Sequence, residues 1–369
     1  MTDVLNQRAL NRALLARQLL LERSEMSVPE ALERLAGMQA QAPLPPYTGL
    51  WTRLVDFDPE SLSRLLLERE AVRIVLMRGT VHLVTSRDYR MLRPLLQPLL
   101  LQLLLNNATY GTHLAGIDLT ELEAAGRTLL AKQPLTLAEL GKQLQAQWPD
   151  RDADSLAQAI RVLAPLVQIP PRGLWGKSGL ARSVTADDWL GEPMRDDATS
   201  DELVLRYLAG FGPATVADAQ AWSGLKRLGA AFERLRPQLV TFRDERNREL
   251  FDLPNAPRPD PDTPAPVRFL PQWDNLLLSH ADRTRIIDEH HRKGLMTVNG
   301  IIPGTVLLGG LVGGIWSIKK DKKTATLHIK PFDLLSRADR MELKEEAARL
   351  LTFAEPNATS HEITIQGGA

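Results

Sequence analysis

Two glutamines, Gln39 and Gln41, stand one residue apart in the segment GMQAQAP, residues 37–43. In an extended chain, alternate side chains project to the same side, so the two amides would face one point. An amide offers one acceptor oxygen and two N–H donors and carries no charge, so the pair could hold and orient a hydrogen-bonding group. The alternative is a polar loop with solvated amides, and the residues alone favour that alternative.

A second dense run of polar residues lies late in the chain. It reads WDNLLLSHADRTR over residues 273–285, and its acids Asp274 and Asp282 could each serve as a base. Clustered acids and arginines also form structural turns held by ion pairs. The residues alone leave both interpretations open, with the structural turn favoured.

The composition and the motifs exclude several kinds of chemistry. The 369 residues include no cysteine, which removes disulfides, thiolate zinc sites, iron–sulfur clusters and a cysteine nucleophile. The sequence contains no phosphate-binding glycine loop and no HExxH or GxSxG motif. The glycines of GGLVGG, residues 309–314, indicate tight β packing, and the adjacent His290 and His291 would point apart on a helix. We expect neither a metal nor a cofactor.

The elements that must position these residues repeat three times along the chain. Each repeat predicts a helix, a second helix opened by a capping pair, a third helix and a strand pair, which is the order of a winged helix. In a capping pair, a hydroxyl accepts from a backbone N–H and an acid lies in the first turn. The pairs are Ser27 with Glu30, Thr136 with Glu139, and Thr215 with Asp218. The hairpins are expected at residues 72–85, 167–184 and 238–253.

A proline-rich stretch separates the repeats from the rest of the chain. Residues 254–266 hold six prolines, which disfavour helix and central strand. Beyond them, Val, Ile and Leu among glycines predict a β-rich, barrel-like domain that ends in a helix near residues 336–353. The expected fold is α+β, mainly α, with three tandem winged-helix units before this domain. The expected boundaries are 1–115, 116–198, 199–253, 254–266 for the linker, and 267–369.

The charge of the chain is balanced overall and uneven locally. Lys and Arg number 45, as do Asp and Glu, which counts against nucleic-acid binding by bulk charge alone. Residues 267–330 nevertheless hold ten Lys and Arg against five acids. The most apolar segment, residues 95–105, is too short to cross a bilayer, and no signal peptide is evident. We therefore expect a cytoplasmic protein.

Three motifs together carry a family resemblance. They are GMQAQAP at residues 37–43, MRGTVHLV at residues 77–84, and DNLLLSHADRTR at residues 274–285. On these motifs the chain resembles the winged-helix DNA-binding family that contains the AlkZ and YcaQ type bacterial DNA glycosylases. The resemblance covers nearly the whole chain. It implies three winged helices in a C-shaped scaffold with a β-rich C-terminal part, which agrees with the repeat count.

The resemblance implies removal of N7-alkylated purines and, in one branch, the unhooking of interstrand crosslinks. That branch carries Gln-x-Gln, whereas the other ends in aspartate, so Gln39 and Gln41 become the candidate catalytic residues. An N7-alkylated purine is cationic and already a good leaving group, so a monofunctional glycosylase need only position a water and stabilise charge at C1′. The candidate supporting residues are Asp274, Asn275, His280, Arg283 and Arg285.

The implied partner is double-stranded DNA with alkylated purines, bound by a monomer that needs no other protein. The candidate DNA contacts are Arg78 and His82 in the first hairpin, and Lys319, Lys320, Lys322 and Lys323 at a hairpin tip within residues 316–329. Two other functions stay open. One is a winged-helix transcriptional regulator, which would read spaced half-sites as a dimer. The other is a non-catalytic protein that shields lesions, whose activity would not depend on the glutamines.

Overall fold

The first helices begin where capping residues end the preceding loops. In the computed structural model, which describes residues 3–295 and 302–366, Ser27 and Glu30 form the predicted capping box, and Asp58 caps the helix that starts at Pro59. The predicted helices are confirmed, and a short additional helix, α3, follows the glutamine segment. The elements are β1 (Val4–Leu5), α1 (Gln7–Arg17), α2 (Val28–Arg34), β2 (Met38–Gln39), α3 (Pro45–Trp51) and α4 (Pro59–Leu67).

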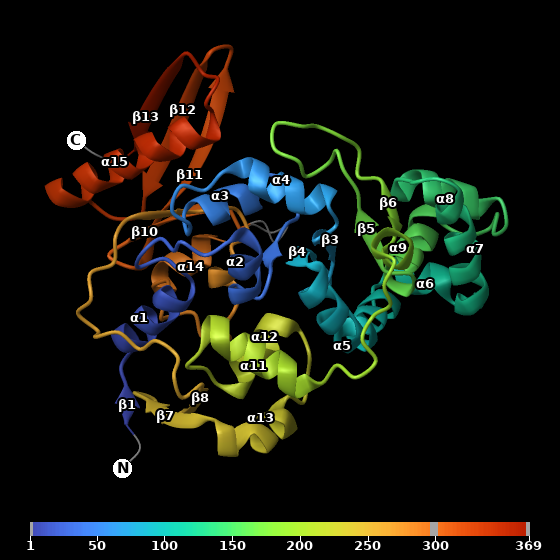
Figure 1. Ribbon diagram of the computed structural model, residues 1–369, viewed down its shortest axis with the longest axis horizontal. Coiled ribbons are helices and arrows are strands. Elements are labelled where there is room, and N and C mark those ends of the chain that lie inside the picture. Colours follow the sequence, from blue (N-terminus) through green and yellow to red (C-terminus); the bar gives the residue numbers. More distant parts are fainter. Residues whose placement is uncertain (1–2, 296–301, 367–369) are drawn as a thin grey trace.

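The hairpins of the first two repeats share one sheet (Figure 1). The strands β3 (Ala71–Val75) and β4 (Val81–Thr85) pair antiparallel as predicted, and so do β5 (Leu166–Gln168) and β6 (Ser183–Thr185). Arg73 on β3 pairs with Gln168 on β5, and β2 adds to the free side of β4. The order is β2-β4-β3-β5-β6. The first two repeats, with an expected boundary between residues 115 and 116, therefore contribute strands to one common sheet.

The helices of the second repeat surround a core of their own. Leu122, Leu140, Leu156 and Ile160 are buried in a cluster distinct from the main core. The three helices predicted for this repeat are confirmed. They are α7 (Leu119–Lys132), α8 (Leu137–Gln145) and α9 (Ala153–Leu163), with α5 (Ser86–Leu105) and α6 (Tyr110–Leu114) before them and α10 (Ala186–Leu190) after β6. None of the helices in the described residues is both long and apolar enough to span a membrane.

The third repeat packs against the first through the main core. Its hairpin pairs antiparallel as predicted, and β1 joins it in parallel, with Val4 opposite Arg243. The N-terminal strand thus lies beside the third repeat (Figure 1). The elements are α11 (Ser200–Phe211), α12 (Val216–Ser223), α13 (Gly229–Leu235), η2 (Arg236–Gln238), β7 (Val240–Asp244) and β8 (Glu249–Asp252). The helix–helix–helix–hairpin order is observed in the second and third repeats, and the first repeat adds α3 to it. The number of winged-helix units and their identity stay predictions.

The C-terminal sheet is open, so the expectation of a barrel-like domain is wrong. Its order is β13-β12-β11-β10-β9. Helix α15 packs against the sheet through its buried side chains Leu343, Ala347 and Leu350. The strand that follows it, β13, pairs in parallel with β12 and does not pair with β9. Two edges therefore remain in the part of the chain that the structure describes, and the α+β class is confirmed. The elements are β9 (Arg268–Leu270), η3 (Asn275–Leu277), α14 (Glu289–Leu295), β10 (Gly304–Leu308), β11 (Leu311–Asp321), β12 (Thr324–Pro331), α15 (Arg337–Ala354) and β13 (Ser360–Ile365).

Candidate active site

The glutamine segment forms the edge of the shared sheet. Gly37 opens it with a φ of 82°, and a Cβ there would lie 2.5 Å from Cγ1 of Val84, so only glycine fits. Gln39 then pairs with His82 across β2 and β4, and the N–H of Ala40 donates to the carbonyl of Val81 at 2.7 Å. The strand covers Met38–Gln39, and the chain bends at Gln41.

The two glutamine side chains differ in exposure but are anchored in the same way. Gln39 is 7% exposed, whereas Gln41 is an exposed residue. Oε1 of Gln39 accepts from Nη2 of Arg78 at 3.0 Å, and Oε1 of Gln41 accepts from the N–H of Val81 at 3.1 Å. Each amide oxygen has a second lone pair, so each can still accept from a water molecule. Within the described residues, both Nε2 groups also lack a protein acceptor.

Arg78 connects the first glutamine to two distant parts of the chain. It lies in η1 (Met77–Gly79), the turn between β3 and β4. Its guanidinium donates to the carbonyl of Trp222, to Gln39, and to Oδ1 of Asn275 at 3.2 Å. Burial, followed by the nearby charge of Arg283, lowers the pKa of Arg78 to about 10. The group is therefore still a cation at neutral pH.

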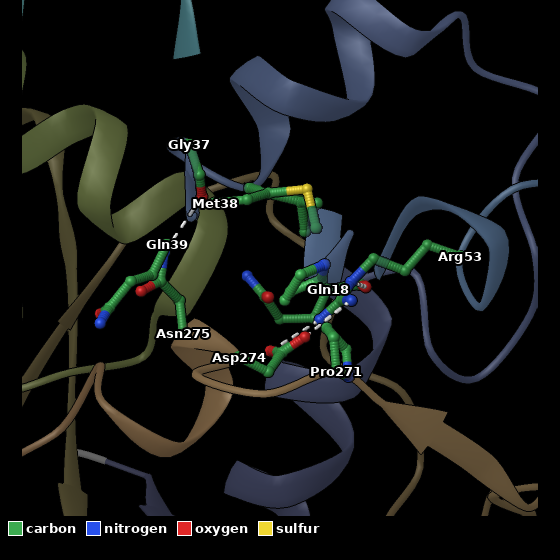
Figure 2. Close-up of a pocket in the computed structure, with 10 residues that line it drawn as sticks. Gln18, Gly37, Met38, Gln39, Arg53, Pro271, Asp274 and Asn275 are labelled. Carbon is green, nitrogen blue, oxygen red and sulfur yellow. Dashed lines mark hydrogen bonds and ion pairs between the residues drawn. The ribbon is translucent and has the colours of Figure 1, made fainter. Parts of the chain in front are cut away.

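The late polar run supplies the support behind Gln39 (Figure 2). Asp274 forms two contacts of 2.9 Å with Arg53 and caps the N–H of Leu276, while Nδ2 of Asn275 donates to the carbonyl of Gly37 at 3.1 Å. The cavity between these groups has about 10 Å³ of free space. That is about the volume available to one water molecule, so a purine cannot enter it.

A profile described as DNA glycosylase AlkZ-like matches residues 32–353, which include the glutamine segment, Arg78 and Asn275. The chain belongs to the AlkZ-like DNA glycosylase family. It is therefore an enzyme whose substrate is DNA, and the predicted family membership is confirmed.

A relative and a solved structure, both from Streptomyces sahachiroi, are similar to this AlkZ-like glycosylase. An interstrand DNA cross-link repair glycosylase is 28% identical over 364 residues, which cover 90% of this chain and 92% of that protein. The solved structure of DNA glycosylase AlkZ matches with a TM-score of 0.81 at 21% identity, over 98% of this chain and 100% of that chain. This second likeness supports the fold.

The buried histidines of the AlkZ-like glycosylase are structural. His82, expected to contact DNA, is 0% exposed, and its Nδ1 lies 3.0 Å from the carbonyl of Thr80, so it has no surface to offer a phosphate. His280 lies 3.1 Å from the carbonyl of Phe211 and is equally buried. Burial lowers the pKa of each ring to about 3, which keeps both neutral.

Arg285 of the late polar run binds a part of the chain away from the glutamines. Nη1 of Arg285 donates to the carbonyl of Pro213 at 2.8 Å, and the side chain is buried. Arg283 is part-buried, and burial lowers its pKa. Of the five expected supporting residues, Asn275 therefore contacts the site directly, and Asp274 holds the adjoining turn.

The free energy of unfolding of the AlkZ-like glycosylase is expected to decrease as the pH is lowered from about 6 to about 4. The unfolded chain protonates His82 and His280 near their ordinary pKa of 6.5, whereas the folded chain does not until about pH 3. Each histidine thus lowers the free energy of unfolding by about 1.4 kcal/mol for each unit by which the pH falls within that window. Asp88 opposes them, because burial raises its pKa to about 6 and its contribution is lost as pH rises. The net dependence of the free energy of unfolding on pH should therefore equal the contribution of about one histidine.

Urea denaturation at several pH values measures this slope. The variant His280→Asn should flatten it, Asp88→Asn should steepen it, and His113→Asn should leave it unchanged because His113 is exposed. A slope that none of the three variants alters would contradict the assignment.

Sequence reasoning missed a second arginine behind the glutamines. Arg73 is 2% exposed in β3, and its Nη2 donates to the carbonyl of Ala40 at 2.8 Å, between the two glutamines. Burial lowers its pKa to about 10. An arginine in the middle of the apolar run AVRIV, residues 71–75, was the available signal, because a cation inside a buried strand must find acceptors.

The four lysines lie where the sequence predicted a hairpin tip. Asp321 pairs with Thr324, and the turn between them consists of Lys322 and Lys323, both exposed. Nζ of Lys320 pairs with Glu355 at 2.8 Å. This end of the C-terminal sheet projects from the body of the molecule (Figure 1).

Proposed function

We propose that this glycosylase hydrolyses the N-glycosidic bond of N7-alkylated purines, using a water positioned by Gln39 and Gln41. The observation that carries the proposal is the anchoring of both amide oxygens at the edge of one sheet. Fixed oxygens with a free lone pair are oriented acceptors, and oriented groups need little reorganisation when charge develops. An alternative role as a passive lesion shield would have no use for this arrangement.

The chemistry suits neutral groups because the substrate supplies the driving force. The water oxygen bonds to C1′ as the C1′–N9 bond breaks, and the electron pair of that bond neutralises the cationic purine. The water proton is released to solvent. A carbonyl dipole can accept from the attacking water and face the positive charge at C1′ without generating hydroxide. Asp274, which lines the cavity beside Gln39, is paired with Arg53 and is not needed as a base.

The substrate class extends to purines joined across two strands. The cavity beside Gln39 cannot enclose a base, and Gln41 is exposed, so the site handles its target at the surface. A crosslinked base cannot swing into an enclosing pocket as a small flipped base does. The relative from S. sahachiroi, an interstrand DNA cross-link repair glycosylase, supports this extension. We further propose that the enzyme acts on double-stranded DNA as a monomer in the cytoplasm.

The hairpin of β11 and β12 is the proposed secondary contact to DNA. Lys319, Lys322 and Lys323 are exposed, and they surround one acid, Asp321. Phosphate oxygens bind such a concentration of ammonium groups without regard to base sequence. The overall charge of zero makes a local basic element of this kind necessary for electrostatic binding.

The test uses end-labelled duplexes that carry either an N7-linked guanine monoadduct or an N7–N7 crosslink. Incubation with the full chain is followed by mild alkali, which breaks strands at abasic sites, and a denaturing gel separates the products. Unhooked strands and breaks at the adducted guanine are expected, with none in an undamaged duplex of the same sequence. Tight binding to every damaged duplex without an abasic product would overturn the proposal in favour of a lesion shield.

A further inference from the structure

The turn that carries Arg78 is held in an unfavourable conformation. Arg78 has a φ of 56°, in the left-handed region that costs a residue with a side chain about 1–2 kcal/mol. Its backbone packs against Gly224, where an added Cβ would lie 3.5 Å from the N and Cα atoms of Arg78. Gly224 ends α12 just after Trp222, whose carbonyl receives Nη1 of Arg78. Strain of this kind persists where surrounding contacts over-determine it, and it is concentrated at functional sites.

The two hydrogen bonds of Nη2 of Arg78 converge on the position of Gln39. Nη2 donates at once to Oε1 of Gln39 and to Oδ1 of Asn275, while Nδ2 of Asn275 donates to the carbonyl of Gly37. Asn275 therefore holds both the main chain before Gln39 and the arginine that grips its side chain. Its own turn is fixed by the ion pair between Asp274 and Arg53.

We propose that Arg78 is a positioning residue for the reaction, orienting the Gln39 amide, with Asn275 setting the guanidinium plane. This inference rests on the proposed hydrolysis at Gln39. The rigid, planar guanidinium is required, because a single group must donate to the carbonyl of Trp222 and to the side-chain amides of Gln39 and Asn275 at the same time. The resulting fixed geometry leaves one lone pair of Oε1 free to accept from the water.

A contact between Arg78 and DNA phosphate is the competing role, and the two roles predict different kinetics. If Arg78 contacts a phosphate, its replacement should raise the Kd for DNA, lower the salt dependence of binding by about one unit and leave the chemical step intact. If Arg78 positions Gln39, its replacement should lower the single-turnover rate at saturating enzyme and leave the Kd and its salt dependence nearly unchanged. Three of the guanidinium hydrogen bonds are made inside the protein, which favours positioning.

The experiment is a double-mutant cycle on the single-turnover rate of unhooking. Gln39→Ala, Arg78→Ala and the double variant are compared, with Arg78→Lys as a milder change and Arg87→Lys as an exposed-arginine control. We expect Arg78→Ala to slow the chemical step by about 10- to 100-fold, since a displacement of about 1 Å can have that effect. In the Gln39→Ala background the same change should matter by less than about threefold, because the two act as a unit.

Fluorescence-detected DNA binding and thermal unfolding accompany the rates, so that a loss of folding is recognised. If Arg78→Ala is unfolded, Arg78→Lys decides the question by the same cycle. Independent, multiplicative effects of Arg78 and Gln39, or a rate loss that saturating enzyme repairs, would overturn the inference while leaving the proposed function in place. An inactive wild-type chain would instead refute the proposed function.

Discussion

Replacing Gln39 with alanine is expected to lower the single-turnover rate of base release by about 100-fold or more. Removal of one preorganised group that stabilises developing charge typically has an effect of about 10²- to 10³-fold. The Kd for damaged DNA should change by less than about threefold, because Gln39 is only 7% exposed and offers little surface to the duplex. Gln41→Ala should slow the same step, and because Gln41 is exposed it should also alter the Kd more than Gln39→Ala does.

The matched control is a glutamine with a structural hydrogen bond elsewhere. Gln145 donates to the carbonyl of Arg151 near the end of α8, so Gln145→Ala should leave the rate unchanged. A second variant, Gln39→Glu, keeps the length of the side chain and places a carboxylate against Arg78. Equal losses of rate and affinity in Gln39→Ala would argue that the glutamine binds DNA instead of serving the chemical step.

Replacing Asp252 with alanine is expected to lower the free energy of unfolding by about 3–5 kcal/mol. Asp252 is 0% exposed and accepts from Arg17 at 2.6 and 2.8 Å, from Arg258 at 2.6 Å, and from the N–H of Leu253. The substitution would leave the guanidinium of Arg17 buried without its anion, since that side chain is also 0% exposed. Urea denaturation followed by circular dichroism measures the change.

An exposed pair of the same chemistry provides the control. Arg234 contacts Asp201 through a side chain that is 56% exposed, so Asp201→Ala should cost less than about 1 kcal/mol. The double variant Arg17→Met with Asp252→Leu removes both charges and should recover much of the loss. If Asp252→Ala were no more destabilising than Asp201→Ala, the buried pair would not be a principal link between α1 and β8.

This link matters for the active site because the site is assembled from separate parts of the chain. The glutamines belong to the first repeat, Trp222 to the third, and Asn275 to the C-terminal region. Arg17 and Asp252 join the first repeat to the third, as Arg53 and Asp274 join it to the C-terminal region. We therefore interpret both buried pairs as contacts that keep the parts in register.

Most helices could be predicted because their boundaries depend on local interactions. The first helix predicted for the second repeat is observed as Leu119–Lys132, where Asp118 caps the N-terminus by accepting two backbone N–H groups. The three capping pairs also form capping boxes, since Ser27, Thr136 and Thr215 lie three residues before their acids. The helix at 45–51 was missed because it lacks a side-chain cap, and two prolines at its start are also typical of a loop.

The sheet pairings beyond each hairpin could not be predicted. A hairpin is specified by its own turn, whereas the bridge from Arg73 to Gln168 joins strands about a hundred residues apart. The barrel-like expectation failed for the same reason, because alternating apolar residues predict a strand but not its neighbour. The parallel return of β13 beside β12 depends on how α15 packs its buried leucines.

The sequence by itself determined which residues carry the candidate chemistry, and tertiary structure decided what each of them does. The family resemblance of three sequence motifs selected Gln39, Gln41, Arg78 and Asn275, because residue type and spacing alone favoured a polar loop and a structural turn. Burial turned His82 from an expected DNA contact into a neutral structural residue, and long-range hydrogen bonds drew Arg78 inward to Gln39. Solvent access and partners at large sequence separation arise only when the elements pack together, because they depend on distances that no local pattern encodes.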